Sequence, residues 1–250
     1  MTADVSETLF ISDLHLTAER PAIIELFSRF VNERAVKADA LYILGDFFEY
    51  WVGDDDPADE LAAVFGAFNN LHDHHVPVYF MHGNRDFLIK KDFEKRTHCQ
   101  LIQDPTTINI NQRDILLMHG DSLCTDDIKY QQFKTQVRSH EWQKTFTSKP
   151  LSERKLIVEN LRKTSQSETS EKNDDIMDVN KQAVNEIVQA HRVNWLIHGH
   201  THRPDIHCFT VDNQPVTRIV LGDWYDHGSV LSVKSHPLSD GFEFELENFQ

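Results

Sequence analysis

The sequence has few cysteines and no long apolar run, and each shortage excludes a class of protein. Its 250 residues include three cysteines, Cys99, Cys124 and Cys208, which are far apart and odd in number. This spacing provides neither a disulfide framework nor a Cys-x-x-Cys metal site, so we expect a reducing compartment such as the cytosol. No apolar run approaches the roughly 18 residues of a membrane span, and the acidic start MTADVSE lacks the features of a signal peptide. We therefore expect any contact with a membrane to be made from one side.

Positive charge is also scarce. Lys and Arg number 25 against 40 Asp and Glu, which gives a formal net charge of −15 at pH 7. Binding to nucleic acid depends on a basic surface, so we expect no nucleic acid as a partner. An apolar fraction of 40% in a chain of 250 residues is sufficient for a sizeable core. We predict a single α/β domain over residues 1–250 that contains an insertion.

Five short apolar runs recur along the chain, and each is followed by polar residues. The runs TLFIS, ALYIL, VPVYFM, DILLM and NWLI are rich in Val, Ile, Leu, Phe and Tyr. The polar residues that follow them are Asp13 and His15, then Asp46, then Asn84 and Arg85, then His119 and Asp121, and finally His200 and His202. Runs of this length and composition predict strands that are buried on both faces.

The segments between the first strands have helical spacing. In PAIIELFSRFVNERA, residues 21–35, the apolar residues share one stripe and Pro21 suits a position in the first turn. The stretch DELAAVFGAFNNLHDHH, residues 59–75, repeats the pattern. Alternating strands and helices favour an α/β sheet, in which ligands bind beyond the carboxyl ends of the strands. The five polar clusters, although far apart in the chain, can therefore meet in one place.

The stretch WLIHGHTHRP places His198, His200 and His202 at alternate positions. In an extended chain, a side-chain period of two would send all three to one face. Such a concentration of imidazoles favours a bound metal, although we interpret His198 as a core or supporting residue. Glycines beside the clusters, such as Gly83 and Gly199, would let another group approach closely.

The donor atoms of these clusters suit metal ions. The candidate ligands are Asp13, His15, Asp46, Asn84, His119, His200 and His202. One ion cannot use seven such ligands, whereas two ions can if one carboxylate bridges them. Nitrogen and oxygen donors without sulfur suit Mn, Fe or Zn. Two metal ions about 3.5–4 Å apart form a site for in-line displacement at phosphorus, so the set predicts hydrolysis of a phosphate ester or anhydride.

Other polar residues have simpler interpretations. His72, His74 and His75 lie at a predicted helix end, where cationic groups favour the helix dipole. The acidic stretch DDDP at 54–57 could be a third metal site, but a solvated loop with a helix N-cap is the preferred interpretation. An isolated Asp-x-His after a strand is also more often a cap and a surface imidazole. The metal prediction therefore rests on the five clusters together.

The motifs Asp-x-His, Gly-Asp, Gly-Asn-Arg-Asp, His-Gly-Asp and Gly-His-Thr-His together resemble those of the calcineurin-like metallophosphoesterases. The resemblance implies an αββα sandwich with a dinuclear metal centre. Longer stretches are similar to the family of UDP-2,3-diacylglucosamine diphosphatases, which act in lipid A biosynthesis. The similarity extends from Leu9 to about Trp224, and its most specific motifs are GDDDP, LCTDD and IMDVN.

The resemblance also implies roles for individual residues. It implies two Mn²⁺ per chain, one held by Asp13, His15, Asp46 and His202 and the other by Asp46, Asn84, His119 and His200, with Asp46 as the bridge. It implies that Asn84 and Arg85 are catalytic, with Arg85 stabilising charge on the attacked phosphate. The implied substrate-binding residues are Asn84, Arg85, Asp127, Ser165, Thr169, Lys172 and His200. Thr169 stands where the family has an Asn, so its contact would lack the amide group.

An insertion of about residues 128–180, with no strand-like run, separates His119 from the final histidines. Residues 133–163 carry eight basic side chains against three acidic ones, and their apolar residues have roughly helical spacing. The basic residues of the second half are Arg154, Lys155, Arg162 and Lys163. One interpretation is a solvated helical lid; the other is a basic amphipathic lid that faces anionic lipid headgroups and shelters acyl chains. The resemblance favours the second, and implies a peripheral protein on the cytoplasmic side of the inner membrane.

Three functional hypotheses remain. The first is a Mn²⁺-dependent hydrolase that adds water at the α-phosphorus of UDP-2,3-diacylglucosamine, giving UMP and 2,3-diacylglucosamine 1-phosphate. The second is a dinuclear-metal phosphodiesterase that acts on a soluble nucleotide or phosphodiester; the lid would distinguish it from the first. The third is a non-catalytic member that binds a partner. That member would be expected to lose ligands, yet all seven are present beside Arg85.

Overall fold

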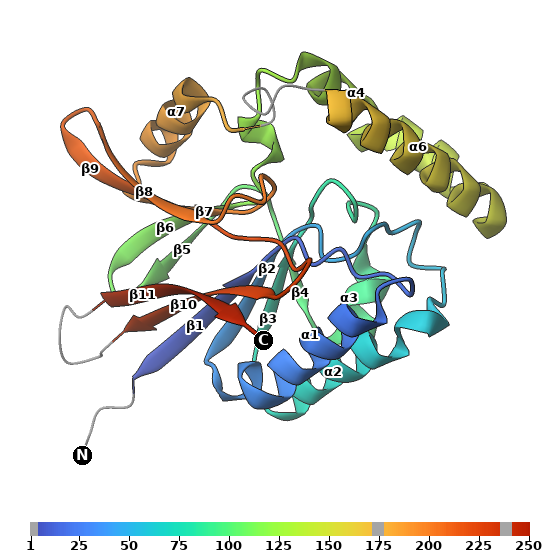
Figure 1. Ribbon diagram of the computed structural model, residues 1–250, viewed down its shortest axis with the longest axis horizontal. Helices are drawn as coiled ribbons and strands as arrows, with labels where there is room; N and C mark the ends of the chain where they lie inside the picture. Colours follow the sequence, from blue (N-terminus) through green and yellow to red (C-terminus); the bar gives the residue numbers. More distant parts are fainter. Residues whose placement is uncertain (1–4, 172–177, 236–241) are drawn as a thin grey trace.

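Two β-sheets face each other in the computed structural model, which describes residues 5–171, 178–235 and 242–250 (Figure 1). The first sheet has the strand order β11 (Phe242–Phe249), β10 (Gly228–Ser235), β1 (Ser6–Ile11), β2 (Ala40–Leu44), β3 (Val78–Met81) and β4 (Gln100–Ile102). The second has the order β5 (Thr106–Ile110), β6 (Arg113–Met118), β7 (Trp195–His198), β9 (Gln214–Val220) and β8 (Asp205–Val211).

Helices cover the outer face of each sheet (Figure 1). The first sheet is covered by α1 (Pro21–Glu33), α2 (Ala62–Asp73) and α3 (Lys91–Thr97), and the second by α7 (Lys181–His191). Short 3-10 helices occupy Ala35–Lys37, Asp59–Leu61 and Asp121–Leu123. Three further helices, called the lid helices below, stand beyond the edge of the sandwich: α4 (Ile128–Arg138), α5 (His140–Thr147) and α6 (Leu151–Glu171).

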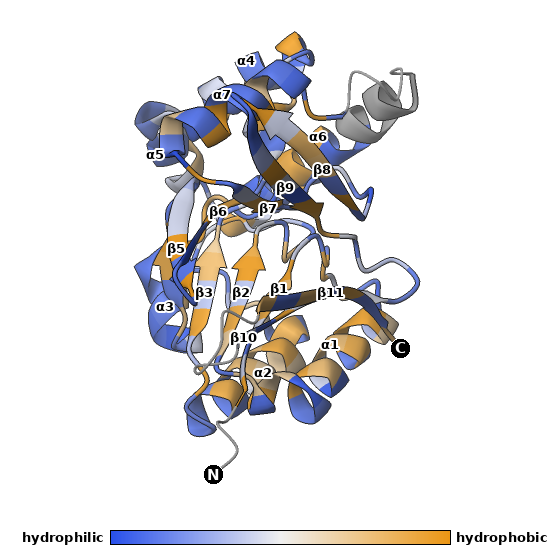
Figure 2. Cartoon of the chain, turned by 90° about the vertical axis from the view of Figure 1, so that its left-hand side faces the viewer, coloured by the Kyte–Doolittle hydropathy of each residue, from blue (hydrophilic) through white to orange (hydrophobic). Residues whose placement is uncertain are grey.

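Three separate apolar clusters fill the spaces between these layers. One lies between the first sheet and its helices and contains Leu9, Phe27 and Phe68. A second lies between the two sheets and includes Phe10, and a third joins α7 to the second sheet. Figure 2 shows the apolar colour concentrated on the strands and on the helix faces turned toward them. The αββα sandwich with a helical insertion, expected from the family resemblance, is therefore confirmed.

The predicted strands are buried on both faces, because successive side chains enter different clusters. In β6, Ile115 and Leu117 point between the sheets, whereas Leu116 and Met118 point toward α7. All five apolar runs form strands, β1, β2, β3, β6 and β7, as expected. Strands β4, β5 and β8 to β11 were not foreseen. Three of them, β5, β8 and β11, lie at sheet edges and alternate largely between half-buried and exposed residues.

Parallel pairing brings the polar clusters to one edge of the sandwich. Strands β1 to β4 run parallel to one another, as do β6, β7 and β9. The carboxyl ends of β1, β2 and β3 therefore lie together, opposite those of β6 and β7. Hydrogen bonds join the two sheets here, including one of 2.9 Å from the His200 N–H, which follows β7, to the carboxylate of Asp13, which follows β1.

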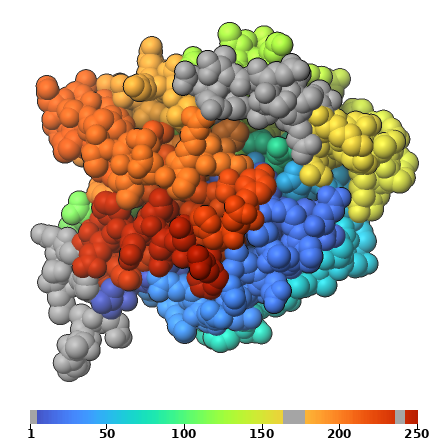
Figure 3. Space-filling view, in the orientation of Figure 1, coloured from blue at the N-terminus to red at the C-terminus, as the bar shows by residue number. Residues whose placement is uncertain are grey.

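Three of the four basic residues in the second half of the insertion face the body of the protein, whereas Lys163 is exposed and pairs with Glu159 of its own helix. This corrects part of the expectation for the insertion. Arg154 is 2% exposed, pairs with Asp55 and donates a hydrogen bond of 2.6 Å to the Val52 carbonyl. Lys155 pairs with Asp56, and Arg162 with Glu49 (the yellow part of α6 lies against the body in Figure 3). The interpretation of these three residues as a surface for anionic lipid was wrong. The acidic loop after β2 binds these three side chains instead. In each ion pair a basic and an acidic group, both partly removed from water, neutralise each other.

Asp54 caps a helix that is remote in sequence. Its carboxylate accepts hydrogen bonds from the backbone N–H groups of Lys90, Asp92 and Phe93 at the start of α3, and from the Trp51 indole. The expected helix N-cap in DDDP is therefore present, but it serves α3 and not the next helix in the chain. Within the described ranges, Asp54 belongs to neither candidate metal group.

We predict that Asp54→Ala destabilises the protein by roughly 2 kcal/mol, because several donors at the start of α3 lose their acceptor. Urea unfolding of the metal-loaded protein measures the effect. Asp73→Ala, which removes an exposed aspartate at the end of α2, is the control and should change the free energy of unfolding little. Equal stability of the two variants would contradict the capping role.

Candidate metal centre

Asp13, His15 and His202 form the first of two groups that could hold a metal ion. Asp13 and His15 follow β1, and His202 follows β7, so the group joins both sheets. The Nε2 atoms of His15 and His202 are 3.3 Å apart, and His202 Nε2 is 3.4 Å from Asp13 Oδ1. Two ligands bound at about 2.1 Å to one ion lie roughly 3.0–3.4 Å apart at octahedral or tetrahedral angles, so these spacings suit a shared ion.

Asp46, His119 and His200 form the second group. Asp46 follows β2, and the two histidines follow β6 and β7. His119 Nε2 is 3.7 Å from Asp46 Oδ1 and 3.0 Å from the side-chain oxygen of Asn84, which follows β3. The structure thus brings together all seven predicted ligands. The groups are neighbours, because the His200 N–H donates to Asp13 Oδ2 at 2.9 Å.

Three of the imidazoles are oriented by a partner on Nδ1, which leaves Nε2 facing the centre of its group. The partners and distances are Glu49 Oε2 at 3.3 Å for His15, Asp223 Oδ2 at 3.1 Å for His202 and the Leu44 carbonyl at 2.9 Å for His119. A carboxylate or carbonyl on the outer ring nitrogen fixes the tautomer and raises the basicity of the inner nitrogen. This arrangement is typical of metal-binding histidine.

The environment of Asp13 tests whether a cation fits. Its Oδ2 accepts hydrogen bonds from the Ser12 hydroxyl at 2.6 Å and from the His200 N–H. Its Oδ1 is buried and has no hydrogen-bond partner among the described residues. A buried carboxylate oxygen without a partner is costly unless a positive charge lies beside it. The donor set and this oxygen therefore fit a divalent cation.

The electrostatics of both groups favour positive charge. Burial lowers the pKa of His202, but hydrogen bonds to Asp13 and Asp223 outweigh it and raise the pKa to about 10. Burial also lowers the pKa of His119, and the charges of Asp46 and Asp121 outweigh it and raise the pKa to about 9. Acidic neighbours therefore favour the protonated form of both imidazoles. A bound metal ion would take the place of that proton.

Five predicted ligands have left-handed backbone conformations, which side chains other than glycine rarely adopt. The residues and φ angles are Asp13 at 56°, His15 at 49°, Asp46 at 48°, His200 at 71° and His202 at 54°. Each such residue costs about 1–2 kcal/mol, and strain of this kind concentrates at functional sites. The turns that follow the strands thus direct the side chains toward common centres.

Two glycines let the ligand loops approach one another. A Cβ on Gly83 would lie 2.1 Å from the Asp46 carboxylate, and one on Gly199 would lie 2.3 Å from Asp13 Oδ2. Any side chain at either position would separate the strand ends that carry the ligands. The predicted role of these glycines in close approach is confirmed.

The three alternating histidines of the last cluster do not share one face. Strand β7 ends at His198, and the left-handed turns at His200 and His202 send their side chains to different groups. His198 remains in the core, where its Nδ1 donates to the Gly199 carbonyl and burial lowers its pKa to about 3. The prediction of one extended face was wrong, because the turn replaces the strand after His198. The interpretation of His198 as a core residue is confirmed.

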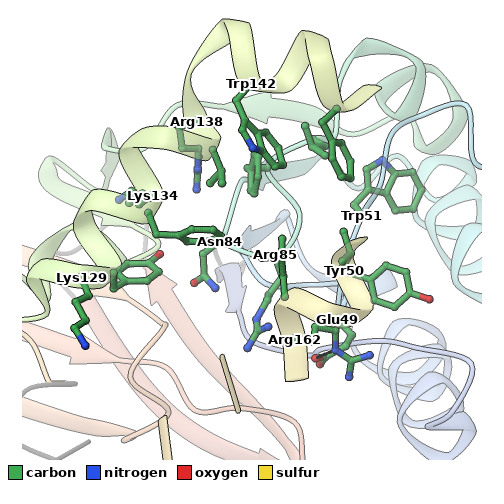
Figure 4. A pocket seen from close by; sticks show the side chains of 18 residues that line it. Glu49, Tyr50, Trp51, Asn84, Arg85, Lys129, Lys134, Arg138, Trp142 and Arg162 are labelled. Atoms are coloured by element: carbon green, nitrogen blue, oxygen red, sulfur yellow. Dashed lines mark ion pairs between the residues drawn. The ribbon is translucent and has the colours of Figure 1, made fainter. Parts of the chain in front are cut away.

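A cavity of about 330 Å³ lies between the lid helices and the candidate metal centre (Figure 4). Asn84 and Arg85 line it at the metal end. Arg85 is held by a hydrogen bond from its backbone N–H to Asp46 Oδ1 at 2.8 Å. The apolar lining of the cavity includes Phe87, Phe133, Val137, Trp142, Phe146 and Leu161. The polar and apolar parts of this cavity are therefore continuous.

The remaining predicted substrate residues lie on the lid helices or beyond them. Asp127 is the N-cap of α4, where its side chain accepts the Tyr130 N–H. Ser165 and Thr169 are part of α6, but the description does not extend to their side chains. Lys172 lies outside the described residues. The substrate contacts of these four residues stay predictions.

The residues that support the ligands were not among those predicted from the sequence. Glu49 and Asp223 orient His15 and His202, and the buried Asp86 accepts hydrogen bonds from the N–H groups of Gly83 and Phe47, tying two ligand loops together. Glu49 lies three residues after Asp46, and Asp86 two residues after Asn84. A search for further carboxylates beside each cluster could have found both, and Asp223 follows a sixth apolar run, IVL, in the same Gly-Asp layout as Asp46.

A family model and two similar sequences indicate the family of this chain. Residues 7–204 match the model of the calcineurin-like phosphoesterases. Two relatives named UDP-2,3-diacylglucosamine hydrolase are similar over most of the chain. The relative from Stenotrophomonas maltophilia R551-3 is 48% identical over 236 residues, 92% of this chain and 95% of the relative. The one from Serratia proteamaculans 568 is 47% identical over 228 residues, 91% and 95% of the two chains. A solved archaeal phosphodiesterase is 14% identical, with a TM-score of 0.47 over 96% of this chain and 99% of its own.

We predict that Asp46→Asn is more harmful than His15→Asn. Asp46 is the predicted bridge, so its loss should disturb both ions, whereas loss of His15 should weaken one. Activity at saturating Mn²⁺ should be at least roughly tenfold lower in the Asp46 variant. Metal analysis should find fewer bound ions there than in the His15 variant. Equal, small losses with two metals retained in both would refute the bridging assignment.

Proposed function

Since the chain belongs to the calcineurin-like phosphoesterase family, we propose that it hydrolyses the diphosphate bond of UDP-2,3-diacylglucosamine. Relatives that carry this activity in their names are 47–48% identical over more than nine-tenths of the chain. One observation carries the proposal: an apolar cavity beneath the lid helices opens onto the candidate metal centre. This substrate carries its diphosphate between a uridine and a sugar with two acyl chains, so a charged group and an apolar part follow one another as the two parts of the cavity do.

The proposed reaction adds water at the α-phosphorus. The new bond joins the water oxygen to that phosphorus, and the bond from the α-phosphorus to the bridging oxygen breaks. The products are UMP and 2,3-diacylglucosamine 1-phosphate, which belongs to lipid A biosynthesis. Two divalent cations, when bound, would activate the water and neutralise charge on the phosphate.

The residues of the chain position the diphosphate. Arg85 lies at the metal end of the cavity, and its buried Nε has no hydrogen-bond partner among the described residues. Its guanidinium can therefore donate to phosphate oxygens and stabilise the charge that develops on them. Asn84, beside it, offers an amide between the second metal group and the cavity. The lid helices cover this end and limit the access of water.

For the metal we propose two Mn²⁺ per chain. The support is a set of carboxylate, amide and imidazole donors without a thiolate, a mixture that suits Mn²⁺ among other ions. The first group would hold one ion through Asp13, His15 and His202, together with Asp46, which both ions would share. The second would hold the other through Asp46, Asn84, His119 and His200.

The membrane is the proposed place of action, on the cytoplasmic side of the inner membrane and as a peripheral protein. Among the described residues, no helix is both long and apolar enough to cross a bilayer. The support comes from the lid helices, which expose apolar side chains: Ile128 is 65% and Leu156 57% exposed, and Phe133 and Leu161 are also exposed. Contact of these side chains with lipid would place the cavity beside the membrane that contains the diacylated substrate.

We predict that removal of metal abolishes hydrolysis and that added Mn²⁺ restores most of it, with two ions bound per chain. The reason is that the ligands converge on two centres, where bound cations would activate the water and neutralise the diphosphate together with Arg85. Dialysis against a chelator, followed by titration with Mn²⁺ and metal analysis, tests this. Full turnover by exhaustively demetallated protein would overturn the metal chemistry.

We predict that the native protein cleaves the diacylated UDP-sugar at least roughly a hundredfold more efficiently than its deacylated form, because each buried methylene contributes about 0.8 kcal/mol.

The double variant Phe133→Ser/Leu161→Ser should lower kcat/KM for the diacylated substrate about tenfold or more. Hydrolysis of a small aryl phosphodiester should change little. Ile206→Ser, which alters an exposed apolar residue on β8, is the control. If the deacylated UDP-sugar and the aryl phosphodiester were cleaved as efficiently as the diacylated UDP-sugar, the hypothesis of a phosphodiesterase for soluble substrates would be favoured instead.

We predict that Ile128→Ser/Leu156→Ser weakens binding to vesicles of phosphatidylethanolamine and phosphatidylglycerol at least roughly tenfold, because two apolar contacts with lipid are lost. The factor should be similar at low and high salt, since apolar contacts are not screened. Co-sedimentation with vesicles measures it, with Ile206→Ser as the control. Binding that disappears at high salt but ignores both apolar substitutions would show electrostatic association, and no binding at all would refute the peripheral location.

A further inference from the structure

The ion pairs that join α6 to the loop after β2 are not equivalent. The pairs are Arg154 with Asp55, Lys155 with Asp56 and Arg162 with Glu49. The carboxylates of Asp55 and Asp56 belong to neither candidate metal group. Glu49, in contrast, also contacts His15, a predicted ligand of the first group. One ion pair of the lid helices therefore ends directly beside the metal centre.

The two carboxylate oxygens of Glu49 contact different partners: one lies beside Arg162 of the lid, the other beside the predicted ligand His15. Its Oε1 lies 2.9 Å from Arg162 Nε, and its Oε2 lies 3.3 Å from His15 Nδ1. Its backbone N–H donates to the Leu16 carbonyl at 3.0 Å, which fixes the residue beside the loop that carries His15. The residue is 8% exposed, so both contacts are only weakly screened by water. Figure 4 shows Glu49 and Arg162 together beneath Arg85.

We propose that Glu49 is a positioning residue that couples closure of the lid helices to metal binding at His15. With α6 in place, Arg162 holds Oε1 and so directs Oε2 at His15 Nδ1. The imidazole held in this way presents Nε2 to Asp13 and His202. With α6 displaced, the carboxylate would lose one of its two partners and regain side-chain freedom, and the orientation of His15 would weaken.

The coupling also acts in the reverse direction. A cation on Nε2 of His15 adds positive charge to the ring beside Glu49, which strengthens the attraction across the 3.3 Å contact at Nδ1 and orders the Glu49 carboxylate in the position that Arg162 recognises. By thermodynamic linkage, metal binding must favour the closed lid by the same factor as the closed lid favours metal binding. The inference rests on the proposed metal site and not on the identity of the substrate. Loading with metal would thus close the lid helices over the cavity.

The chain provides a matched control for this coupling. Arg154 and Asp55 form an equally direct pair between α6 and the same loop, with a second hydrogen bond from Arg154 to the Val52 carbonyl. Breaking this pair loosens α6 without touching the contact between Glu49 and His15. A general effect of lid attachment can therefore be separated from the path through Glu49.

The experiment compares the full chain with three variants, Glu49→Gln, Arg162→Met and the control Asp55→Asn. Titration calorimetry gives the affinity and number of Mn²⁺ sites, and hydrogen exchange of α6 is followed with and without Mn²⁺. Glu49→Gln should weaken one of the two sites about 10- to 100-fold. Arg162→Met should weaken the same site about fivefold or more although it contacts no ligand. In both variants Mn²⁺ should no longer slow exchange in α6, as it does in the native chain.

Asp55→Asn should behave differently: faster exchange in α6, unchanged Mn²⁺ affinity and retained slowing by Mn²⁺. Native affinity in Arg162→Met would overturn the coupling even if Glu49→Gln binds Mn²⁺ weakly, because Glu49 would then orient His15 without help from the lid. Equal weakening in Asp55→Asn and Arg162→Met would also overturn it, by showing a general effect of lid attachment. If the native chain binds no Mn²⁺, the proposed metal chemistry itself is wrong, and the coupling fails with it.

Discussion

The carboxylate of Asp13 connects the two sheets at the edge where their strands end. One oxygen accepts hydrogen bonds from Ser12, beside β1, and from the His200 N–H, which follows β7. Gly199 is required beside it, because a Cβ there would lie 2.3 Å from the same oxygen. The other oxygen is buried and has no hydrogen-bond partner in the described part of the chain. The junction of the sheets therefore requires a positive charge, and His202 lies where a cation would be shared with it.

The strain of the ligand turns is compatible with folding because rigid elements hold both ends of each turn. Left-handed residues such as Asp13 and Asp46 come directly after buried strands. Hydrogen bonds connect neighbouring turns, including those from the Asp13 N–H to the Gly45 carbonyl and from the Phe47 N–H to the Asp86 carboxylate. Such strain persists only where the surrounding structure determines the conformation. The ligands are thus placed in advance, and binding of metal need not organise the loops.

The parts that the sequence predicted are those with local signals. Buried parallel strands give continuous apolar runs, and ligands at their carboxyl ends follow in the next few residues, as Asp13 follows β1. Contacts across the fold have no such signal. The excess of basic residues in the insertion suggested a surface for anionic lipid, yet Arg154 is buried against Asp55, 99 residues earlier in the chain. Composition counts charges, whereas only the fold shows which opposite charge lies beside each of them.

The pairing of these charges determines what the lid helices present to each side. Basic residues such as Arg154 and Arg162 bind the acidic loop after β2, so they are withdrawn from the outer surface, on which apolar side chains such as Leu156 are exposed. Inside, the walls change from apolar at Trp142 to polar at Arg85, beside the metal centre. A soluble nucleotide would leave the apolar walls facing water, whereas an amphiphile would satisfy both ends. Because one contact of the lid passes through the carboxylate beside His15, the proposed coupling would make selection of the lipid and assembly of the metal centre depend on the same closed arrangement.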